Sequence, residues 1–423
     1  MTLLRWWMVA ACLVVACGDD DGPDDTPRDG GGMADASRPD ASLDAAVPDA
    51  ARADGGLDFR SFDQAMESAI SRYNAARDGG AEIVGASAAV ITADGGTVHT
   101  KGYGTFAADR VYLIASASKI LAAGVLLRLA DQGKLSVDAP ISAQLDEWGA
   151  HKTGVSVAQL VSNSSGLPSL AEISAAGANP TGPDFARLTP HFCQYNTPGS
   201  LADCGKAIYQ DDAPEGNREP DKVFRYGGSQ WQLAGALAEQ VSGKKWAELI
   251  RETYVDPCGA ASLAFTNPYA PRTDGTTTAS YPAWFQGKAA NAPATENPNI
   301  EGGAYANAPD YAKLLLMHLR GGKCGNTQVL SENAVRTMQT DRVAKYGGKL
   351  ETVPGMPAPY TGYGMGWWLR DDQIADPGAY GAYPFLDLKR GYGAVILFEV
   401  TSAVGTQIAL SVKPSLDAIF DAR

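Results

Sequence analysis

The chain has 423 residues, of which 45% are hydrophobic and 20% are charged, and its formal net charge is −13. Residues 18–57 hold 11 aspartates and 3 arginines and so contribute −8; with one positive charge at Arg5, residues 58–423 carry −6. A chain of this charge lacks the basic surface that nucleic-acid binding requires, and we expect no nucleic-acid partner.

The first 17 residues contain one basic side chain, Arg5, followed by an apolar run that ends at Cys17. This run is too short to span a bilayer and has the layout of a secretory signal. A small residue before a cysteine that is followed by a polar tail resembles a bacterial lipobox. We therefore expect residues 1–17 to be a lipoprotein signal peptide and Cys17 to be lipidated, which places the protein in the periplasm or cell envelope.

Residues 18–57 consist largely of Asp, Ala, Gly, Pro and Ser, which predicts a disordered tether. The remaining residues, 58–423, suffice for one two-lobed unit. Residues 59–77 predict an opening helix, and residues 86–91 and 97–102 predict a hairpin. An apolar run at 111–115 then gives way to a strongly helical segment at 120–135.

The tetrapeptide Ser116-Ala117-Ser118-Lys119 lies at this junction. If the helix begins near the serine, Ser116 and Lys119 lie on one face, three residues apart. A serine becomes a good nucleophile only when a base takes its proton, and a lysine can do so only if burial or the helix N-terminus keeps its amine uncharged. The backbone N–H of Ser116 would be an unpaired donor of the first turn, available to an oxyanion. The spacing is typical of a serine nucleophile with a lysine base.

Ser-x-x-Lys alone is a weak signal, because Ser242-Gly243-Lys244-Lys245 also matches it. That second copy follows a helical pattern and predicts a turn. For Ser116 the simpler interpretation is a helix-capping serine beside an exposed lysine. The sequence around Ser116 decides between the two interpretations.

Residues 113–119, followed by Gly-Lys-Leu-Ser-Val-Asp-Ala-Pro at 133–140, resemble the nucleophile helix of the serine β-lactamase-related superfamily. This superfamily includes class C β-lactamases, DD-peptidases and β-lactamase-fold esterases. Residues 160–168 are similar to its Leu-Leu-x-His-Thr-Ser-Gly-Leu turn. Residues 302–312 resemble its glycine-rich entry to a late helix, and residues 363–368 resemble the start of its terminal strands.

The resemblance implies an α/β (α+β) fold of the β-lactamase/transpeptidase type. We expect an antiparallel sheet flanked by N- and C-terminal helices, with a mostly helical insert at about residues 155–293 and the active site in the groove between them. The pattern along the chain agrees, since strands return from residue 363 and a final helix is predicted at 414–421.

The second catalytic element of the superfamily is a tyrosine followed two residues later by an asparagine. Here the matching segment is Tyr226-Gly227-Gly228. The resemblance implies that Tyr226 transfers a proton between Ser116 and the leaving group. Gly228 lies on the substrate side but cannot make the family asparagine's contacts with substrate and lysine. A buried structural tyrosine is the alternative.

The third element is usually Lys-Thr-Gly or His-x-Gly, whose cation binds a substrate carboxylate. Lys389-Arg390-Gly391 matches as a string, but it lies between two predicted strands, 383–388 and 392–398, and predicts a hairpin tip. We therefore do not assign the family's cation to it.

Residues 376–387 resemble the family strand better. In this register Asp376 replaces the cation, Gly378 follows in the substrate-binding segment, and Ala379 supplies the second oxyanion donor through its backbone N–H. A carboxylate at this position would repel anionic substrates. Neutral esters, or amides that carry a cationic group, are the expected substrates.

Four further cysteines, Cys193, Cys204, Cys258 and Cys324, allow three pairings in an exported chain, with free thiols as the alternative. Because Cys193 and Cys204 lie in one loop-like region, we favour Cys193 with Cys204 and Cys258 with Cys324. The four histidines lack metal-ligand spacing, and we expect neither a metal nor a cofactor.

These features predict an exported, lipid-anchored, monomeric serine hydrolase that cleaves an ester or amide through an acyl-enzyme on Ser116. Its substrate would be a small-molecule or peptide-like acyl compound, and Cys17 would hold it to a membrane. The first alternative is a β-lactamase or DD-peptidase of the same fold, which Asp376 disfavours. The second is a catalytically silent binding protein, which Gly228 and Asp376 favour and the Ser116–Lys119 pair opposes.

Overall fold

The computed structural model describes residues 56–212, 219–269, 280–343, 350, 360–371 and 373–423. The expected signal segment with Cys17 and the expected tether up to residue 55 lie outside the described residues. Within the described ranges, no helix has the length and apolar character needed to cross a membrane.

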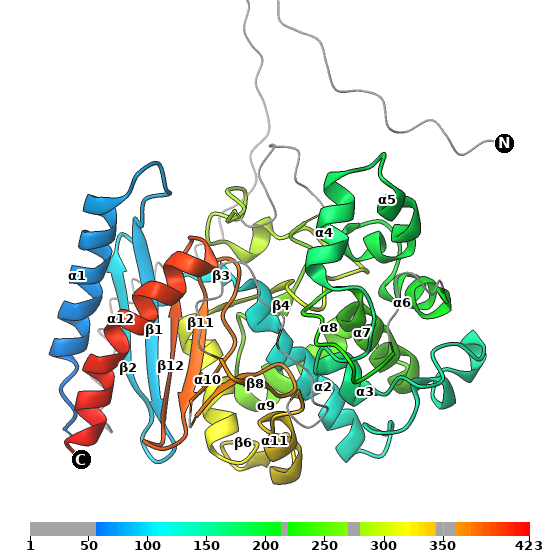
Figure 1. Ribbon diagram of the computed structural model, residues 1–423. Coiled ribbons are helices and arrows are strands. Elements are labelled where there is room, and N and C mark those ends of the chain that lie inside the picture. Colours follow the sequence, from blue (N-terminus) through cyan, green and yellow to red (C-terminus); the bar gives the residue numbers. More distant parts are fainter. Residues whose placement is uncertain (1–55, 213–218, 270–279, 344–349, 351–359, 372) are drawn as a thin grey trace, which may run out of the picture. The chain divides into compact units, whose positions relative to one another are not determined.

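A seven-stranded antiparallel sheet forms one lobe (Figure 1), in the strand order β2-β1-β12-β11-β10-β9-β8. Its strands are β1 (Gly85–Thr92), β2 (Gly96–Gly104), β8 (Gly362–Tyr363), β9 (Trp368–Arg370), β10 (Gln373–Ala375), β11 (Tyr383–Asp387) and β12 (Tyr392–Leu397). The two hairpins expected from the sequence are confirmed as β1–β2 and β11–β12. Gly391 has φ +68° and turns the second hairpin, so Lys389 and Arg390 lie at its tip as expected.

Both faces of the sheet are covered, because every residue of β1 is buried. Ala88 and Val90 pack into one apolar cluster with α1 (Arg60–Ala76) and α12 (Ser402–Asp421). Ala89 and Ile91 alternate with them and face the main core, on the side that α10 (Ala308–Leu319) covers (Figure 1). The sheet is thus the middle layer of three.

The final helix is longer than the sequence predicted: it begins at Ser402 rather than near residue 414, and Pro414 lies inside it. A proline in a helix interior costs about 3 kcal/mol. Ile408, Val412 and Leu416 recur four residues apart and bury one face of α12 against the sheet. This burial offsets the cost of the proline, which is why the sequence signal misplaced the boundary.

The second lobe is mostly helical, as expected for the insert. Its helices are α2 (Lys119–Asp131), α3 (Val157–Val161), α4 (Leu170–Ala178), α5 (Pro183–Arg187), α6 (Leu201–Gln210), α7 (Ser229–Ser242), α8 (Trp246–Ile250), α9 (Asp256–Cys258) and α11 (Glu332–Met338). Further helical segments, which are 3-10 helices except for the π-helical η5, are η1 (Ala115–Ser118), η2 (Ile141–Ala143), η3 (Asp146–Trp148), η4 (Thr189–Tyr195), η5 (Arg251–Val255) and η6 (Ala289–Asn291). Small sheets are formed by β3 (Val111–Leu113), β5 (Ala304–Asn307) and β4 (Ala264–Phe265), and by β6 (Lys323–Cys324) and β7 (Thr327–Gln328).

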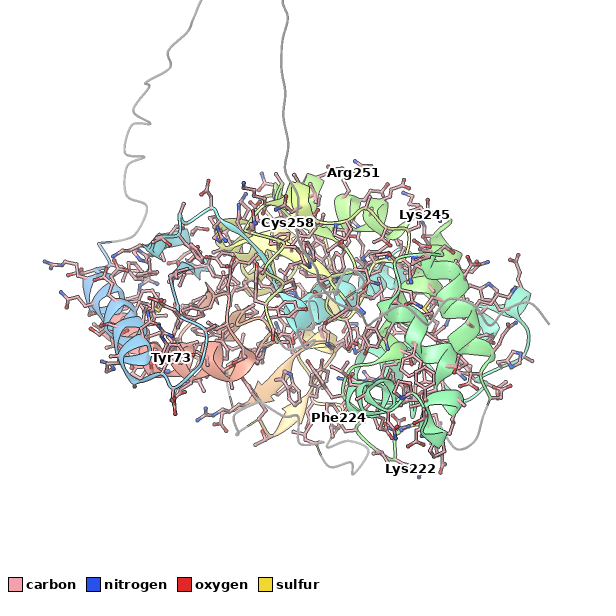
Figure 2. The ribbon with its side chains drawn as sticks, turned by 90° about the horizontal axis from the view of Figure 1, so that it is seen from above. Tyr73, Lys222, Phe224, Lys245, Arg251 and Cys258 are labelled. Atoms are coloured by element: carbon pink, nitrogen blue, oxygen red, sulfur yellow. A yellow bond between two sulfur atoms is a disulfide. The ribbon has the colours of Figure 1, made fainter. Side chains whose placement is uncertain are left out.

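Two disulfides join Cys193 to Cys204 and Cys258 to Cys324, the pairing that the sequence favoured. Cys258, labelled in Figure 2, ends α9, whereas Cys324 lies in β6 beyond α10. This second bridge therefore links the helical insert to the chain segment that follows α10.

His318, a buried residue of α10, should make the free energy of unfolding depend on pH. Burial lowers the pKa of His318 to about 4, from an ordinary value near 6.5. Between these two values the unfolded chain binds a proton that the folded chain does not, so stability falls as pH falls through this window. We expect this residue to remove about 2 to 3 kcal/mol of stability between pH 7.5 and 4.5.

The measurement is urea unfolding of the wild type and of His318→Gln at both pH values. The variant is expected to lose less stability than the wild type on acidification, by about the amount above. An equal pH dependence in the two proteins would show that folding does not lower the pKa of His318, contrary to this prediction.

Candidate active site

Ser116 lies in η1, directly after β3, and its side chain is partly exposed. The preceding residue, Ala115, has φ +46°, a left-handed conformation that costs a non-glycine residue free energy and is commonly retained at functional sites. Ser118 fixes the turn, because its hydroxyl donates to the Ala115 carbonyl at 2.5 Å and accepts from the Ala304 N–H at 3.0 Å. A strained, tightly bonded turn thus presents Ser116 at the surface.

Lys119 is the first residue of α2, which lies on the side of the helical lobe nearest the sheet (Figure 1). Its side chain is completely buried, and Nζ lies 3.0 Å from Oγ of Ser116. The two side chains therefore share one face of the turn, as the spacing predicted. A buried amine in contact with a partly exposed hydroxyl is the arrangement that nucleophile activation requires.

Glu301, which the sequence analysis did not single out, is the other main contact of Lys119. The Nζ of Lys119 donates to the backbone carbonyl of Glu301 at 3.0 Å and lies 3.4 Å from its carboxylate Oε2. The same oxygen accepts the backbone N–H of Gly228 at 2.8 Å. The side chain of Glu301 is almost fully buried, so this carboxylate belongs to the interior of the site.

The charge of Lys119 differs from the expectation. Burial by itself lowers the pKa of Lys119, but the charges around it, with the carboxylate of Glu301 in contact at 3.4 Å, raise it by more, and the net shift is upward. In the resting site Lys119 is therefore a protonated ammonium at neutral pH. The prediction of an uncharged amine was wrong, because it took account of burial and the helix terminus but of no buried carboxylate beside the lysine.

Tyr226 lies against both Ser116 and Lys119. The Nζ of Lys119 is 4.7 Å from the centre of its ring. Burial raises the pKa of Tyr226; the charge of Lys119 and a hydrogen bond with Ser116 lower it, and the net shift is upward. Tyr226 is therefore a neutral phenol at neutral pH, able to donate a proton.

The segment that carries Tyr226 is held by Asn163, in the turn that resembles the family's His-Thr-Ser-Gly turn. The side-chain oxygen of Asn163 accepts from the Gly227 N–H at 3.0 Å and from the indole N–H of Trp231 at 2.9 Å. It also accepts from the amide of Gln230 at 3.2 Å. Asn163 thus positions both the tyrosine loop and the start of α7.

Gly228 leaves no room for the family's asparagine. Its φ is +81°, and a Cβ at this position would lie 2.5 Å from the carbonyl oxygen of Pro168. Only glycine fits, and its N–H is bonded to Glu301. The carboxylate of Glu301 therefore makes the lysine contact that the family asparagine would make.

The 376–379 segment joins β10 to β11 and lies next to the nucleophile turn. A Cβ on Gly378 would lie 2.0 Å from the carbonyl oxygen of Ile114. This close approach of two backbones brings Ala379 beside the chain that leads into Ser116, as the oxyanion assignment requires. Gly378 itself contacts protein backbone here.

Asp376 is completely buried, facing the first backbone N–H groups of α2. Burial raises its pKa well above the ordinary value; the charge of Lys119 and the N–H groups of Lys119 and Ile120 lower it, but less. Asp376 is therefore neutral at neutral pH. Its effect on an anionic substrate comes from the missing cation and not from the charge repulsion that the sequence suggested.

A second set of hydroxyl, imidazole and carboxylate groups lies nearby, but a substrate cannot reach its serine. His191 contacts Ser229 Oγ through Nδ1 at 2.6 Å and Asp211 through Nε2 at 2.9 Å. Ser229 and His191 have no exposed surface. This chain of contacts joins η4 to the start of α7 and has a structural role.

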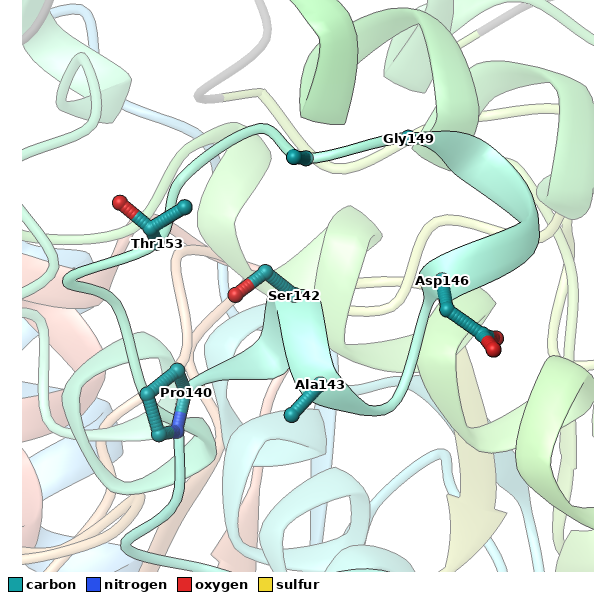
Figure 3. A pocket seen from close by; sticks show the side chains of 7 residues that line it. Pro140, Ser142, Ala143, Asp146, Gly149 and Thr153 are labelled. Carbon is teal, nitrogen blue, oxygen red and sulfur yellow. The ribbon is translucent and has the colours of Figure 1, made fainter.

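A surface hollow lies away from these residues, around η2 and η3 (Figure 3). It is lined by Pro140, Ser142, Ala143, Asp146, Gly149, Ala150 and Thr153. It contains a single carboxylate and none of the residues around Ser116. The reactive group and this hollow are separate features.

The geometry around Ser116 and the fold define a serine hydrolase of the β-lactamase-related superfamily. Residues 70–407 match the family described as Beta-lactamase, and the chain belongs to that family. Penicillin-binding protein 4 of Amycolatopsis lactamdurans is 25% identical over 319 residues, which are 70% of this chain and 74% of that protein.

Two solved structures show the shared fold. One is "EstCE1, a hydrolase with promiscuous acyltransferase activity", with TM-score 0.63 at 18% identity over 85% of this chain and 98% of that chain. The other is the D-amino acid amidase from Ochrobactrum anthropi, with TM-score 0.59 at 16% identity over 84% of this chain and 99% of that chain.

Proposed function

We propose that the protein is an esterase or amidase that works through an acyl-enzyme on Ser116. The observation that carries this proposal is the 3.0 Å contact between Lys119 Nζ and Ser116 Oγ, with the lysine buried and the serine partly exposed. The catalytically silent alternative would have no reason to keep a strained residue before the serine and a buried amine behind it.

In the proposed reaction, Ser116 Oγ bonds to the substrate carbonyl carbon while its proton passes to the base at Lys119. The carbonyl oxygen becomes an oxyanion, which the backbone N–H groups of Ser116 and Ala379 would stabilise. The bond to the leaving group then breaks, and Tyr226 donates a proton to the leaving oxygen or nitrogen and recovers one from Lys119, so the proton of Ser116 is passed on to the leaving group. Water hydrolyses the resulting acyl-enzyme and restores Ser116.

The substrate class follows from position 376. With no cation there, the carboxylate of a penicillin or a peptide C-terminus gains no ion pair at that position. Neutral esters, and amides that carry a cationic group, have no carboxylate that needs such an ion pair, so the missing cation does not weaken their binding. Two structural neighbours, a hydrolase with promiscuous acyltransferase activity and a D-amino acid amidase, agree with such a substrate class.

We also propose that the protein is exported, lipid-anchored at Cys17 and monomeric. Support comes from the apolar run before Cys17, from the acidic composition of residues 18–57, and from two disulfides, which persist in oxidising compartments. Radiolabelled palmitate incorporation that is lost in Cys17→Ser would test the anchor.

The enzymatic proposal is tested with a serine-directed fluorophosphonate and a substrate panel. The wild type is expected to be labelled and to hydrolyse short-chain p-nitrophenyl esters at least about tenfold faster, in kcat/KM, than the anionic cephalosporin nitrocefin. Faster turnover of nitrocefin would favour a β-lactamase or DD-peptidase. No labelling and no turnover would favour the binding protein.

A further inference from the structure

Glu301 is a buried carboxylate that touches the base of the site. Its Oε2 lies 3.4 Å from Lys119 Nζ and accepts the Gly228 N–H at 2.8 Å. Its other oxygen, Oε1, is buried without a hydrogen-bond partner among the described residues. A buried carboxylate oxygen without a hydrogen bond disfavours the charged form of the group. Oε1 is therefore free to bind a proton.

The charge of Lys119 poses a chemical problem for the mechanism. An ammonium has no lone pair and cannot accept the proton of Ser116. Before attack, one proton must leave Nζ, and because the Lys119 side chain is fully buried, transfer to a neighbouring protein group is more direct than transfer to solvent. Glu301 supplies a carboxylate 3.4 Å from Nζ that can accept this proton.

We propose that Glu301 takes this proton, so that Lys119 and Glu301 act together as one base for Ser116. The proposal rests on the acyl-enzyme function proposed above. The carboxylate of Glu301 accepts a proton from the Lys119 ammonium, which leaves a neutral amine and a neutral carboxylic acid. The amine then accepts the proton of Ser116 as Oγ bonds to the substrate carbon. Glu301 is a positioning residue in this scheme, since it acts through Lys119.

Gly228 explains why this chain uses a carboxylate here. A side chain at position 228 would collide with the Pro168 carbonyl, so the family's asparagine cannot reach Lys119 from α7. An asparagine could accept a hydrogen bond from the lysine but could not hold its proton. Glu301, in the segment before β5, contacts Lys119 in place of that asparagine. Unlike an asparagine, it can bind and release a proton.

The other titratable groups near the pair stay neutral at moderate pH. Burial raises the pKa of Tyr195 in η4, of Tyr226 before α7 and of Tyr363 in β8. Asp376, between β10 and β11, holds its proton for the same reason. The pair therefore governs how the reactivity of Ser116 depends on pH.

The test is the pH profile of the second-order rate of fluorophosphonate labelling. In the wild type, the rate should rise once from acid toward neutral pH, as the doubly protonated pair loses one proton, and then level off. In Glu301→Gln, Lys119 must lose its own proton to solvent, so this rise should move upward by at least about one pH unit. At pH 6 that shift lowers the rate by about tenfold or more, and the loss should largely disappear near pH 9.

Glu301→Asp keeps a carboxyl group and should restore the rise to near its wild-type pH, although the rate is lower. Glu239→Gln is the matched control: it removes a buried glutamate that bonds the Trp246 N–H, outside the site, and should leave the profile unchanged.

An equal slowing at every pH would assign Glu301 a structural role and overturn the proposal, as would an unchanged profile. If Glu301→Gln does not fold, the wild type still decides, because a rate with no rise between acid and neutral pH contradicts a Lys119–Glu301 base. Failure of the enzyme function itself would look different: no labelling, or labelling that persists in Ser116→Ala.

Discussion

Ser116→Ala is expected to abolish fluorophosphonate labelling and to lower ester kcat by about 10⁴- to 10⁶-fold. Removing the nucleophile of a serine hydrolase removes the covalent pathway, and the activity that remains comes from binding and the oxyanion site. The Ser116 side chain loses small polar contacts, with Lys119 and Tyr226, and is partly exposed, so the fold should survive. Mass spectrometry of the labelled protein should place the adduct on the peptide that contains Ser116.

Ser229→Ala is the control for this experiment. Ser229 has the bonding pattern of an activated serine, with His191 at 2.6 Å and Asp211 behind it, but it has no exposed surface. We expect labelling of Ser229→Ala to match the wild type. Labelling that depends on Ser229 and not on Ser116 would show that the nucleophile is Ser229, and it would refute the proposed site.

Gly378→Ala has the second largest expected effect, on both stability and activity. The added methyl group would lie 2.0 Å from the carbonyl oxygen of Ile114, a backbone atom that cannot rotate away. The β10–β11 connection and the strand before Ser116 must then separate. We expect a loss of about 3 kcal/mol or more in unfolding free energy, and about a 10²-fold fall in kcat as Ala379 moves from the oxyanion.

Denaturant unfolding and ester turnover measure the two effects. Gly154→Ala is the matched control, because a Cβ there meets nothing within 4 Å and the residue has no positive φ. It should change neither quantity appreciably. If Gly378→Ala were as stable and as active as Gly154→Ala, the tight packing between these segments would have no role.

Local signals in the sequence predicted much of the fold. The hairpin at β1–β2, the opening helix and the tip at Lys389 and Arg390 depend on neighbouring residues, so their patterns are readable without tertiary contacts. The Ser116–Lys119 contact belongs to the same class, since three residues separate the pair. The disulfide pairing followed from the short distance between Cys193 and Cys204 along the chain.

Features that depend on distant contacts could not be predicted in this way. Glu301 lies 182 residues from Lys119, and a glutamate before two glycines has no local pattern that marks a site. The charge of Lys119 was mispredicted for the same reason. Asn163 reaches Gly227 across 64 residues, so its role in holding the tyrosine loop also became visible only in the structure.

The reactive group draws on four stretches of chain: η1 with α2, the loop before α7, the segment before β5 and the β10–β11 connection. The four stretches are spread over residues 115–379, so a proteolytic nick between any two of them, followed by separation of the pieces, should abolish reactivity toward a fluorophosphonate. Adduct formation at Ser116 is consequently an assay of complete folding as well as of chemistry. During refolding, it should appear only with the last cooperative step, after the helical signal has recovered.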